Sequence, residues 1–342
     1  MKKFSHIYVE EDVKNHPLTI KILSKFPKSK IVYINRYSEV FNRPNQNYLV
    51  QKKGQNLIIA KKRHDFLYKG SELCEDFGNI HFFHTSNIYN CVYECEYCYL
   101  QGLYPSAHLV IFVNMEDYFR EIDKLIERKK IYLSISYETD LLALEYLTGF
   151  TREWIEYASS RDLLLEIKTK SANFPALEDL EIPPNVIFAW TLLPQPVIDR
   201  YEKFTPSLEM RLKSIKKAIS RGLRIRISIE PVMYLENFEE VYSQFVEEVF
   251  SCIPEKSVRD VNIGAFRLPK EQAKRIEKLN EASLIFCYDT VVKDEVFTYR
   301  NASDYENFVA EEVKKYVPSE KVYVFNNSES RGPLSSSRSG AR

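Results

Sequence analysis

Short apolar runs alternate with amphipathic stretches along most of this chain. After about residue 80, runs such as Ile131–Ser136 and Ile225–Ile229 are typical of buried strands, and helical sequence follows each of them. Within residues 115–126, the apolar positions recur at the i, i+3, i+4 and i+7 spacing of an amphipathic helix. Asn114 stands immediately before this stretch and is expected to cap the helix.

This alternation predicts the fold class. A strand followed by a helix and a further strand favours right-handed crossovers and a parallel sheet. The roughly six such units fit an α/β fold with a partial (β/α)6 barrel better than a closed eightfold barrel. We predict three regions: a small N-terminal α/β appendage over 1–78, the partial barrel with a C-terminal extension over 79–327, and a disordered tail over 328–342 that is rich in Ser, Arg and Gly.

Composition and charge narrow the class of protein. The 342 residues are 44% hydrophobic and include only nine Gly, which is typical of an ordered globular protein. The formal net charge is +0, so no overall field points to a nucleic-acid partner. Six basic residues between Lys52 and Lys69 are more typical of a solvated face, although they could also serve a nucleic-acid-binding module.

The sequence also bears on location. No segment has the length of a transmembrane helix, and the N-terminal residues lack the apolar run of a signal peptide. Three of the six cysteines are isolated, which agrees with a reducing compartment. We therefore expect a cytoplasmic protein with no membrane partner.

The other three cysteines, Cys91, Cys95 and Cys98, fall within eight residues. Three thiols cannot all pair in disulfides, and they do not complete a four-ligand zinc site. They can ligate three irons of a [4Fe–4S] cluster and leave the fourth iron open, whereas four cysteines would close the cluster for electron transfer. A zinc knuckle that borrows a distant ligand is the alternative interpretation.

The spacing of these cysteines, with an aromatic residue before the last one, resembles the signature of the radical SAM superfamily. In that superfamily the open iron binds S-adenosylmethionine (SAM). The flanking residues resemble the spore photoproduct lyase family. The matching segments are Ser-Asn-Ile-Tyr-Asn-Cys at 86–91, Cys-Glu-Tyr-Cys-Tyr-Leu-Gln at 95–101 and Phe-Val-Asn at 112–114. The resemblance spans roughly residues 75–325.

This resemblance implies an activity, two cofactors and two partners. The family reverses the methylene-bridged thymine dimer, the spore photoproduct, by means of a 5′-deoxyadenosyl radical. We therefore expect a radical SAM barrel and a carbon–carbon lyase that repairs ultraviolet-damaged DNA, with a [4Fe–4S] cluster and SAM as cofactors. Electrons would come from a donor such as flavodoxin or ferredoxin. The alternative is a radical SAM enzyme of the same family that acts on a peptide or another non-DNA substrate.

The resemblance also implies roles for single residues. Cys91, Cys95 and Cys98 would ligate the cluster. Tyr97 and Tyr99 match two family tyrosines that are implicated in passing hydrogen atoms, and the first of them lies near the SAM adenine. The methionine end of SAM would be bound by four residues that follow successive predicted strands, where barrel sites assemble. These residues are Thr139, Asp140, Lys170 and Thr191.

The chain departs from the family pattern at two places. The best-known members carry a cysteine, which returns a hydrogen atom to the thymine radical, where this chain has Tyr137. We expect Cys74 to supply that thiol instead, although an isolated cysteine is often an inert core residue; the remaining candidates are tyrosines. The family's lesion-probing β-hairpin, with its Arg-Tyr pair, has no clear match either, because segment 287–299 is acidic and apolar and Arg300 comes late.

Overall fold

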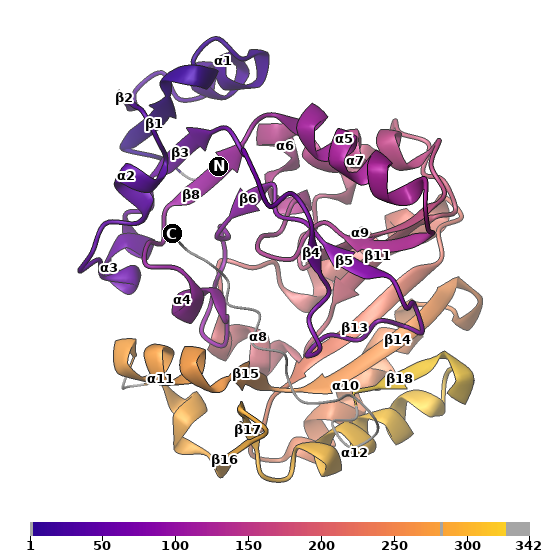
Figure 1. Cartoon of the computed structure of the whole chain (residues 1–342). Coiled ribbons are helices and arrows are strands. Elements are labelled where there is room, and N and C mark those ends of the chain that lie inside the picture. Colours follow the sequence, from indigo (N-terminus) through magenta and orange to yellow (C-terminus); the bar gives the residue numbers. More distant parts are fainter. Residues whose placement is uncertain (1–2, 281–282, 326–342) are drawn as a thin grey trace.

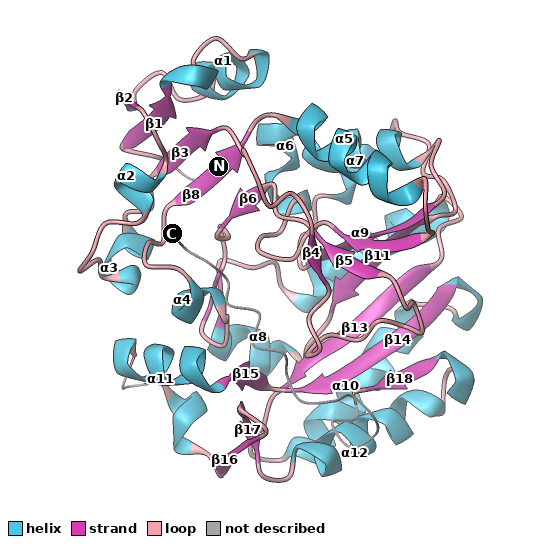
Figure 2. Cartoon of the chain, viewed as in Figure 1, coloured by secondary structure: helices cyan, strands magenta, loops and turns pink. Residues whose placement is uncertain are grey.

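The structure, a computed structural model, describes residues 3–280 and 283–325 and contains two main sheets (Figures 1 and 2). The larger sheet has eight strands in the order β18-β14-β13-β11-β10-β9-β5-β4. The strands are β4 (Tyr68–Lys69), β5 (Phe82–His84), β9 (Ile131–Ser134), β10 (Leu163–Thr169), β11 (Val186–Thr191), β13 (Ile225–Val232), β14 (Val258–Ala265) and β18 (Val322–Val324). The predicted tail, 328–342, lies outside the described residues.

From β5 to β18, neighbouring strands of this sheet are parallel and follow one another in chain order. Only β4 joins antiparallel, next to β5. The two outer strands, β4 and β18, do not pair with each other in the part of the chain that is described. The predicted α/β fold with an open, partial barrel is therefore confirmed, and β18 extends it by one parallel strand.

Helices connect the barrel strands and lie on the outside of the sheet (Figure 1). Those that cover the barrel are α5 (Met115–Ile126), α6 (Glu145–Thr148), α7 (Phe150–Ala158), α8 (Gln195–Tyr201), α9 (Leu208–Ser220), α10 (Phe238–Cys252) and α12 (Ala302–Lys314). Two further helices, α4 (Leu100–Leu103) and α11 (Lys270–Leu279), pack against each other. Of the helices described, none combines the length and the apolar character that crossing a membrane requires.

Asn114 does not cap α5 in the way that the sequence suggested. The helix begins at Met115 as expected, but no side-chain capping bond is formed. Instead the Asn114 amide accepts from the backbone N–H of Lys62 at 2.8 Å and donates to the carbonyl of the same residue at 2.8 Å. The Asn114 side chain thus forms the pair of bonds that a neighbouring strand would form with Lys62. It joins the chain after β3 (Leu57–Ala60) to the start of α5.

The second sheet has five strands in the order β2-β1-β3-β8-β6. Besides β3, these are β1 (His6–Glu10), β2 (Lys30–Ile34), β6 (Ile88–Tyr89) and β8 (Leu109–Phe112), and the N-terminal helices are α1 (Pro17–Ser24), α2 (Ser38–Phe41) and α3 (Tyr48–Lys53). Strands β6 and β8 flank the three clustered cysteines in sequence, so both ends of the cysteine segment are joined to the sheet of the N-terminal region. The domain boundary at residue 78 stays a prediction.

A third sheet follows the barrel and is antiparallel. Its strands are β15 (Arg267–Pro269), β16 (Thr290–Lys293) and β17 (Val296–Tyr299). Strands β16 and β17 form a hairpin in the segment that lacked a match in the sequence. The hairpin turn consists of Asp294 and Glu295, both with positive φ, and is therefore acidic. The aromatic ring of Tyr299 is buried, and Arg300 pairs with Asp289 at 2.9 Å.

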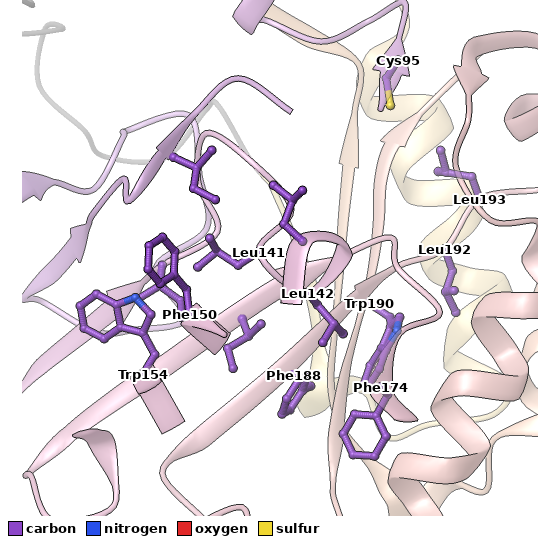
Figure 3. Close-up of a cluster of buried hydrophobic side chains, with 14 of the residues drawn as sticks. Cys95, Leu141, Leu142, Phe150, Trp154, Phe174, Phe188, Trp190, Leu192 and Leu193 are labelled. Atoms are coloured by element: carbon purple, nitrogen blue, oxygen red, sulfur yellow. The ribbon is translucent and has the colours of Figure 1, made fainter. Parts of the chain in front are cut away.

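The apolar core on the outer side of the sheet follows the two-residue alternation of the strands. On β11, Ala189 and Thr191 line a cavity inside the barrel, whereas Phe188 and Trp190 point away from it and stack with ring centroids 5.4 Å apart. Phe174 closes this group, with its ring centroid 5.4 Å from that of Phe188 (Figure 3). One strand therefore supplies both the packing and a wall of the cavity.

A buried ionic cluster closes the inner end of the barrel. The guanidinium of Arg226 donates to the carboxylates of Glu166 at 2.7 Å and Asp260 at 3.0 Å, and to the hydroxyl of Tyr132 at 2.6 Å. Only 3% of the Arg226 side chain is exposed, and the ring of Phe77 covers its guanidinium at 3.1 Å. Because each charge in the cluster has a partner, the cluster is stable without water.

Replacing Arg226 by Met should leave the buried carboxylate of Glu166 without its cation and that of Asp260 with only Arg259, at 3.5 Å. We expect Arg226→Met to lower the free energy of unfolding by about 3–5 kcal/mol, measured as a shift of the urea unfolding midpoint. The matched control is Arg120→Met, which removes an exposed arginine that pairs with Asp117 on the surface; its effect should stay within about 0.5 kcal/mol. Equal effects of the two substitutions would contradict the prediction.

Candidate active site

A cavity of about 430 Å³ opens at the carboxyl ends of the barrel strands. Parallel strands bring these ends to one edge of the sheet, which is where barrel enzymes assemble their sites. Every residue that the sequence singled out for a role lines this cavity. They are Cys74, Cys91, Cys95, Tyr97, Cys98, Tyr99, Thr139, Asp140, Lys170 and Thr191.

The three clustered cysteines lie in one loop, residues 91–98, which we call the Cys loop. All three are free thiols. Within the loop, β7 (Glu94–Cys95) pairs with β12 (Glu202–Lys203), and the amide of Gln101 donates to the carbonyl of Cys95 at 2.7 Å. The amide of Gln55 donates to the carbonyl of Cys91 at 3.2 Å. Burial raises the pKa of each thiol, and bound iron would favour the thiolate form.

The basic segment of residues 52–69 is not one solvated face. The ammonium group of Lys52, a residue that is 5% exposed, donates to the carbonyl of Cys91. Lys62 is 6% exposed, lies over the ring of Tyr89 at 4.8 Å, and has its pKa lowered by burial to about 8. The prediction of a solvated face is wrong for these two lysines. Because both are buried, neither could contact a nucleic acid in a binding module based on this segment.

A buried carboxylate that the sequence did not reveal, Glu202, organises the wall beside the Cys loop. It accepts hydrogen bonds from Tyr97 and Arg211, and its Oε1 lies 3.7 Å from the ammonium of Lys170. Burial acts to raise the pKa of Glu202, but Lys170 and Arg211 prevail and hold this pKa below its usual value. No motif surrounds Glu202; only the pairing of β12 with β7 brings it to the site.

Asp140 joins the ends of two barrel strands. Its carboxylate accepts from the hydroxyl of Thr169 at 2.9 Å and from the backbone N–H groups of Lys170 at 2.7 Å and Ala143 at 3.0 Å. Next to it, the hydroxyl of Thr139 is buried and has no hydrogen-bond partner among the described residues. This hydroxyl is therefore free to bind a polar ligand in the cavity.

Cys74 reaches the cavity on a loop that bridges the open side of the barrel. We call this loop, residues 71–77, the seam loop; it lies between β4 and β5 (Figure 1). The ring of Phe77 lies 6.1 Å from that of Tyr132 on β9 and 5.2 Å from that of Tyr323 on β18. The guanidinium of Arg267 donates to the carbonyl of Leu73 at 3.0 Å. The loop therefore contacts β9 on one side of the opening and the edge strand β18 on the other.

The thiol of Cys74 is hydrogen-bonded to the hydroxyl of Tyr137, with a distance of 3.3 Å between sulfur and oxygen. Burial raises the pKa of Cys74, so the sulfur keeps its hydrogen at neutral pH. The ring of Tyr137 stacks on that of His84 at 4.0 Å, and its carbonyl accepts from the hydroxyl of Tyr99 at 2.9 Å. The structure thus brings Cys74, Tyr99 and Tyr137 together.

A half-buried carboxylate that sequence reasoning also missed, Glu230, stands on the opposite wall. It accepts from the ammonium of Lys168 at 2.8 Å and pairs with Arg267. Burial acts to raise the pKa of Glu230, but Lys168 and Arg267 lower it to about 2. Gly264 makes room for the pair, because a Cβ atom there would lie 2.6 Å from the Arg267 guanidinium. These residues are separated in sequence and form no recognisable motif.

These features fit the two groups expected from the sequence. Three free thiols of one loop face the cavity at the carboxyl edge of an open parallel barrel, and an unpartnered hydroxyl and an ammonium group lie beside them. This combination is what the radical SAM class of enzymes requires to hold a [4Fe–4S] cluster and SAM.

Comparison with known proteins identifies the family. A sequence model of spore photoproduct lyase matches residues 3–325, and the chain belongs to this family. Spore photoproduct lyase of Bacillus subtilis (strain 168) is 23% identical over 282 residues, which cover 80% of this chain and 81% of that protein. The lyase of Geobacillus sp. (strain Y412MC61) is 19% identical over 338 residues, which cover 93% of this chain and 97% of that protein.

Solved structures show the same fold. Spore photoproduct lyase complexed with dinucleoside spore photoproduct superposes with a TM-score of 0.78 at 20% identity, over 94% of this chain and 98% of that one. A double mutant with bound AdoMet and dinucleoside spore photoproduct gives a TM-score of 0.79 at 20% identity, over 94% and 99% of the two chains.

The Cys loop should hold the cluster through all three thiols. Replacing Cys91, Cys95 or Cys98 by Ala should abolish the iron–sulfur absorbance after anaerobic reconstitution, together with reductive cleavage of SAM, because two thiolates cannot retain the cubane in this geometry. Cys252→Ala and Cys287→Ala are the controls and should retain both signals, since neither residue lines the cavity. Stoichiometric zinc without iron–sulfur absorbance in the wild-type protein would contradict the prediction.

Proposed function

We propose that this protein is a radical SAM lyase that reverses the spore photoproduct in ultraviolet-damaged DNA. One observation carries the proposal: the cysteines, tyrosines and polar residues that match the family, and the displaced thiol of Cys74, all line one cavity. Relatives that match over most of their length are spore photoproduct lyases. A peptide or other non-DNA substrate, the alternative considered from the sequence, is not favoured.

The protein contributes binding, orientation and protection from water. When bound, the cluster and SAM supply a 5′-deoxyadenosyl radical that removes a hydrogen atom from carbon. Cys91, Cys95 and Cys98 would ligate the cluster. The methionine end of SAM would be held by Thr139, Asp140, Lys170 and Thr191, and Tyr97 would lie near the adenine. The ion pair with Glu202 keeps the ammonium group of Lys170 charged and directs it toward the wall beside the Cys loop.

The lesion must leave the stacked duplex to enter the cavity. A cross-linked thymine pair stacks and pairs poorly, which lowers the free energy needed to extrude it. Cys74 would then return a hydrogen atom to the thymine radical after the bridge has opened. Tyr99 and Tyr137 lie next to this thiol and are the candidates for relaying hydrogen atoms to it.

Product analysis tests the activity. Purified protein with a reconstituted cluster is incubated anaerobically with SAM, dithionite and the dinucleoside spore photoproduct, and thymidine is quantified by chromatography. Formation of two thymidines per dimer is expected, and no opening of the dimer by the wild type would overturn the proposal. The electron donor, for which we expect flavodoxin or ferredoxin, and the cytoplasmic location stay predictions.

Lys170→Ala should weaken SAM binding and leave photoproduct affinity nearly unchanged. The variant should fold, because Glu202 keeps its bonds to Arg211 and Tyr97. Loss of one charge-assisted bond should raise the dissociation constant for SAM roughly 10-fold or more, measured by equilibrium dialysis of the oxidised, cluster-loaded protein. Lys203→Ala, at an exposed lysine outside the cavity, is the control. Unaltered SAM affinity would remove Lys170 from the SAM site.

Cys74→Ala should still open the dimer but yield less intact thymine. Without the thiol, the product radical should be quenched by solvent species or by the reductant, so adducts should appear in the chromatogram. Cys252→Ala is the matched control and should give the wild-type product distribution, since Cys252 ends α10 outside the cavity. If Cys74→Ala also gives that distribution, the hydrogen donor is Tyr99 or Tyr137.

A further inference from the structure

Two polar atoms on neighbouring strands inside the barrel have no hydrogen-bond partner in the described part of the chain: Oγ of Ser228 and Oδ1 of Asn262. Other such atoms of the cavity wall belong to Ser136, Glu138 and Thr139, which follow β9. Ser228 and Asn262 both line the cavity, and they are 1% and 4% exposed. They stand opposite each other in register on the parallel strands β13 and β14. Because buried polar groups are nearly always paired, two such atoms side by side indicate a place where a ligand supplies the partners.

The orientation of the Asn262 amide is fixed by its neighbours. Its Nδ2 donates to the carboxylate of Glu230 at 3.0 Å, and that carboxylate is also held by Lys168 and Arg267. A carboxylate only accepts hydrogen bonds, so the nitrogen of the amide must face Glu230. Oδ1 is therefore the group left over, and it can only accept. The hydroxyl of Ser228 can donate beside it.

The cavity reaches this depth and extends beyond it. Thr191 on β11 stands opposite Ser228, and the small side chains of Ser134 on β9 and Ala189 on β11 line the cavity next to the ionic cluster, in register with Glu166 and Arg226. The ionic cluster of Arg226 lies one step further in along the strands, two residues before Ser228 on β13, and closes the barrel there. A ligand that enters from the carboxyl edge can thus reach Ser228 and Asn262 before it meets the ionic cluster.

We propose that Ser228 and Asn262 recognise the imide edge of one thymine ring of the photoproduct. Asn262 Oδ1 would accept from the ring N3–H, and the Ser228 hydroxyl would donate to an adjacent ring carbonyl. This inference rests on the proposed lyase function and identifies the part of the lesion that the site recognises. A cytosine ring presents an acceptor at N3 to the acceptor of Asn262, which leaves both unpaired and costs affinity. The pair therefore selects thymine-derived lesions.

Methylation of the ligand tests this without any substitution in the protein. The probes are the dinucleoside spore photoproduct and its two derivatives that carry one methyl group on N3 of either ring. Binding is measured by titration calorimetry with cluster-loaded, SAM-bound protein and no reductant, so that no turnover occurs. We expect methylation of one ring to weaken binding roughly 10-fold or more, and methylation of the other ring to have a smaller effect.

Two substitutions then assign the effect to these residues. Ser228→Ala and Asn262→Ala should bind the unmodified photoproduct more weakly than the wild type does. In these variants, the N3-methylation that weakens binding to the wild type should reduce the affinity by a smaller factor. SAM affinity should not change. Ser214→Ala is the matched control and should behave as wild type, because Ser214 also has a buried hydroxyl without a partner, yet it lies in α9 away from the cavity.

The outcomes separate this inference from the lyase function. If the wild type opens the dimer but binds both methylated derivatives as well as the parent, the recognition pair is refuted and the lyase function stands. Loss of SAM affinity in the two variants, with photoproduct affinity intact, would likewise refute it and place the pair in the SAM site. If the wild type neither binds nor opens the photoproduct, the lyase function itself falls. The comparison of the parent photoproduct with its methylated derivatives uses only wild-type protein, so it tests the inference even if a variant does not fold.

Discussion

The contact between Arg267 and the seam loop holds the site together. An open barrel has two unpaired edges, and something other than a strand must close the gap between them. Here the guanidinium of Arg267 binds the carbonyl of Leu73 at 3.0 Å and the carboxylate of Glu230, and it stacks on the ring of Phe325 at 3.7 Å. One buried cation therefore joins the loop that carries Cys74 to the last barrel strands. A buried charge needs such complete pairing to be tolerated.

Three ionic clusters shape the cavity from different sides. Arg226 with Glu166 and Asp260 closes its inner end, Glu202 with Arg211 and Lys170 supports the Cys loop, and Glu230 with Lys168 and Arg267 forms the opposite wall. In each cluster every charge has an opposite partner, although the formal charges sum to −1 around Arg226 and to +1 around Glu202 and around Glu230. The polar atoms that remain unpartnered in the cavity wall are therefore few, and they include Thr139 Oγ1, Ser228 Oγ and Asn262 Oδ1. A ligand with complementary groups is directed to these positions.

At Tyr137 the chain departs from the family pattern, and the structure brings another thiol close to this position. The position after β9 that carries a thiol in well-known relatives holds a phenol here, and a thiol from the seam loop lies 3.3 Å from that phenol. The two positions are 63 residues apart in the chain. Because the seam loop crosses the barrel mouth, a cysteine on it can reach the space that a cysteine after β9 would occupy.

The sequence alone determined the alternation of strands and helices and the Cys loop, and its resemblance to the family supplied the set of residues that meet in one cavity. Alternating strands and helices force a parallel sheet, and parallel strands place their ends at one edge. The tertiary structure alone decided what surrounds these residues. The burial of Lys52 and Lys62 and the partners of Glu202, Glu230 and Arg267 depend on segments that are distant in the chain. Local patterns record periodicity and spacing, whereas such pairings arise only when the folded chain removes both groups from water.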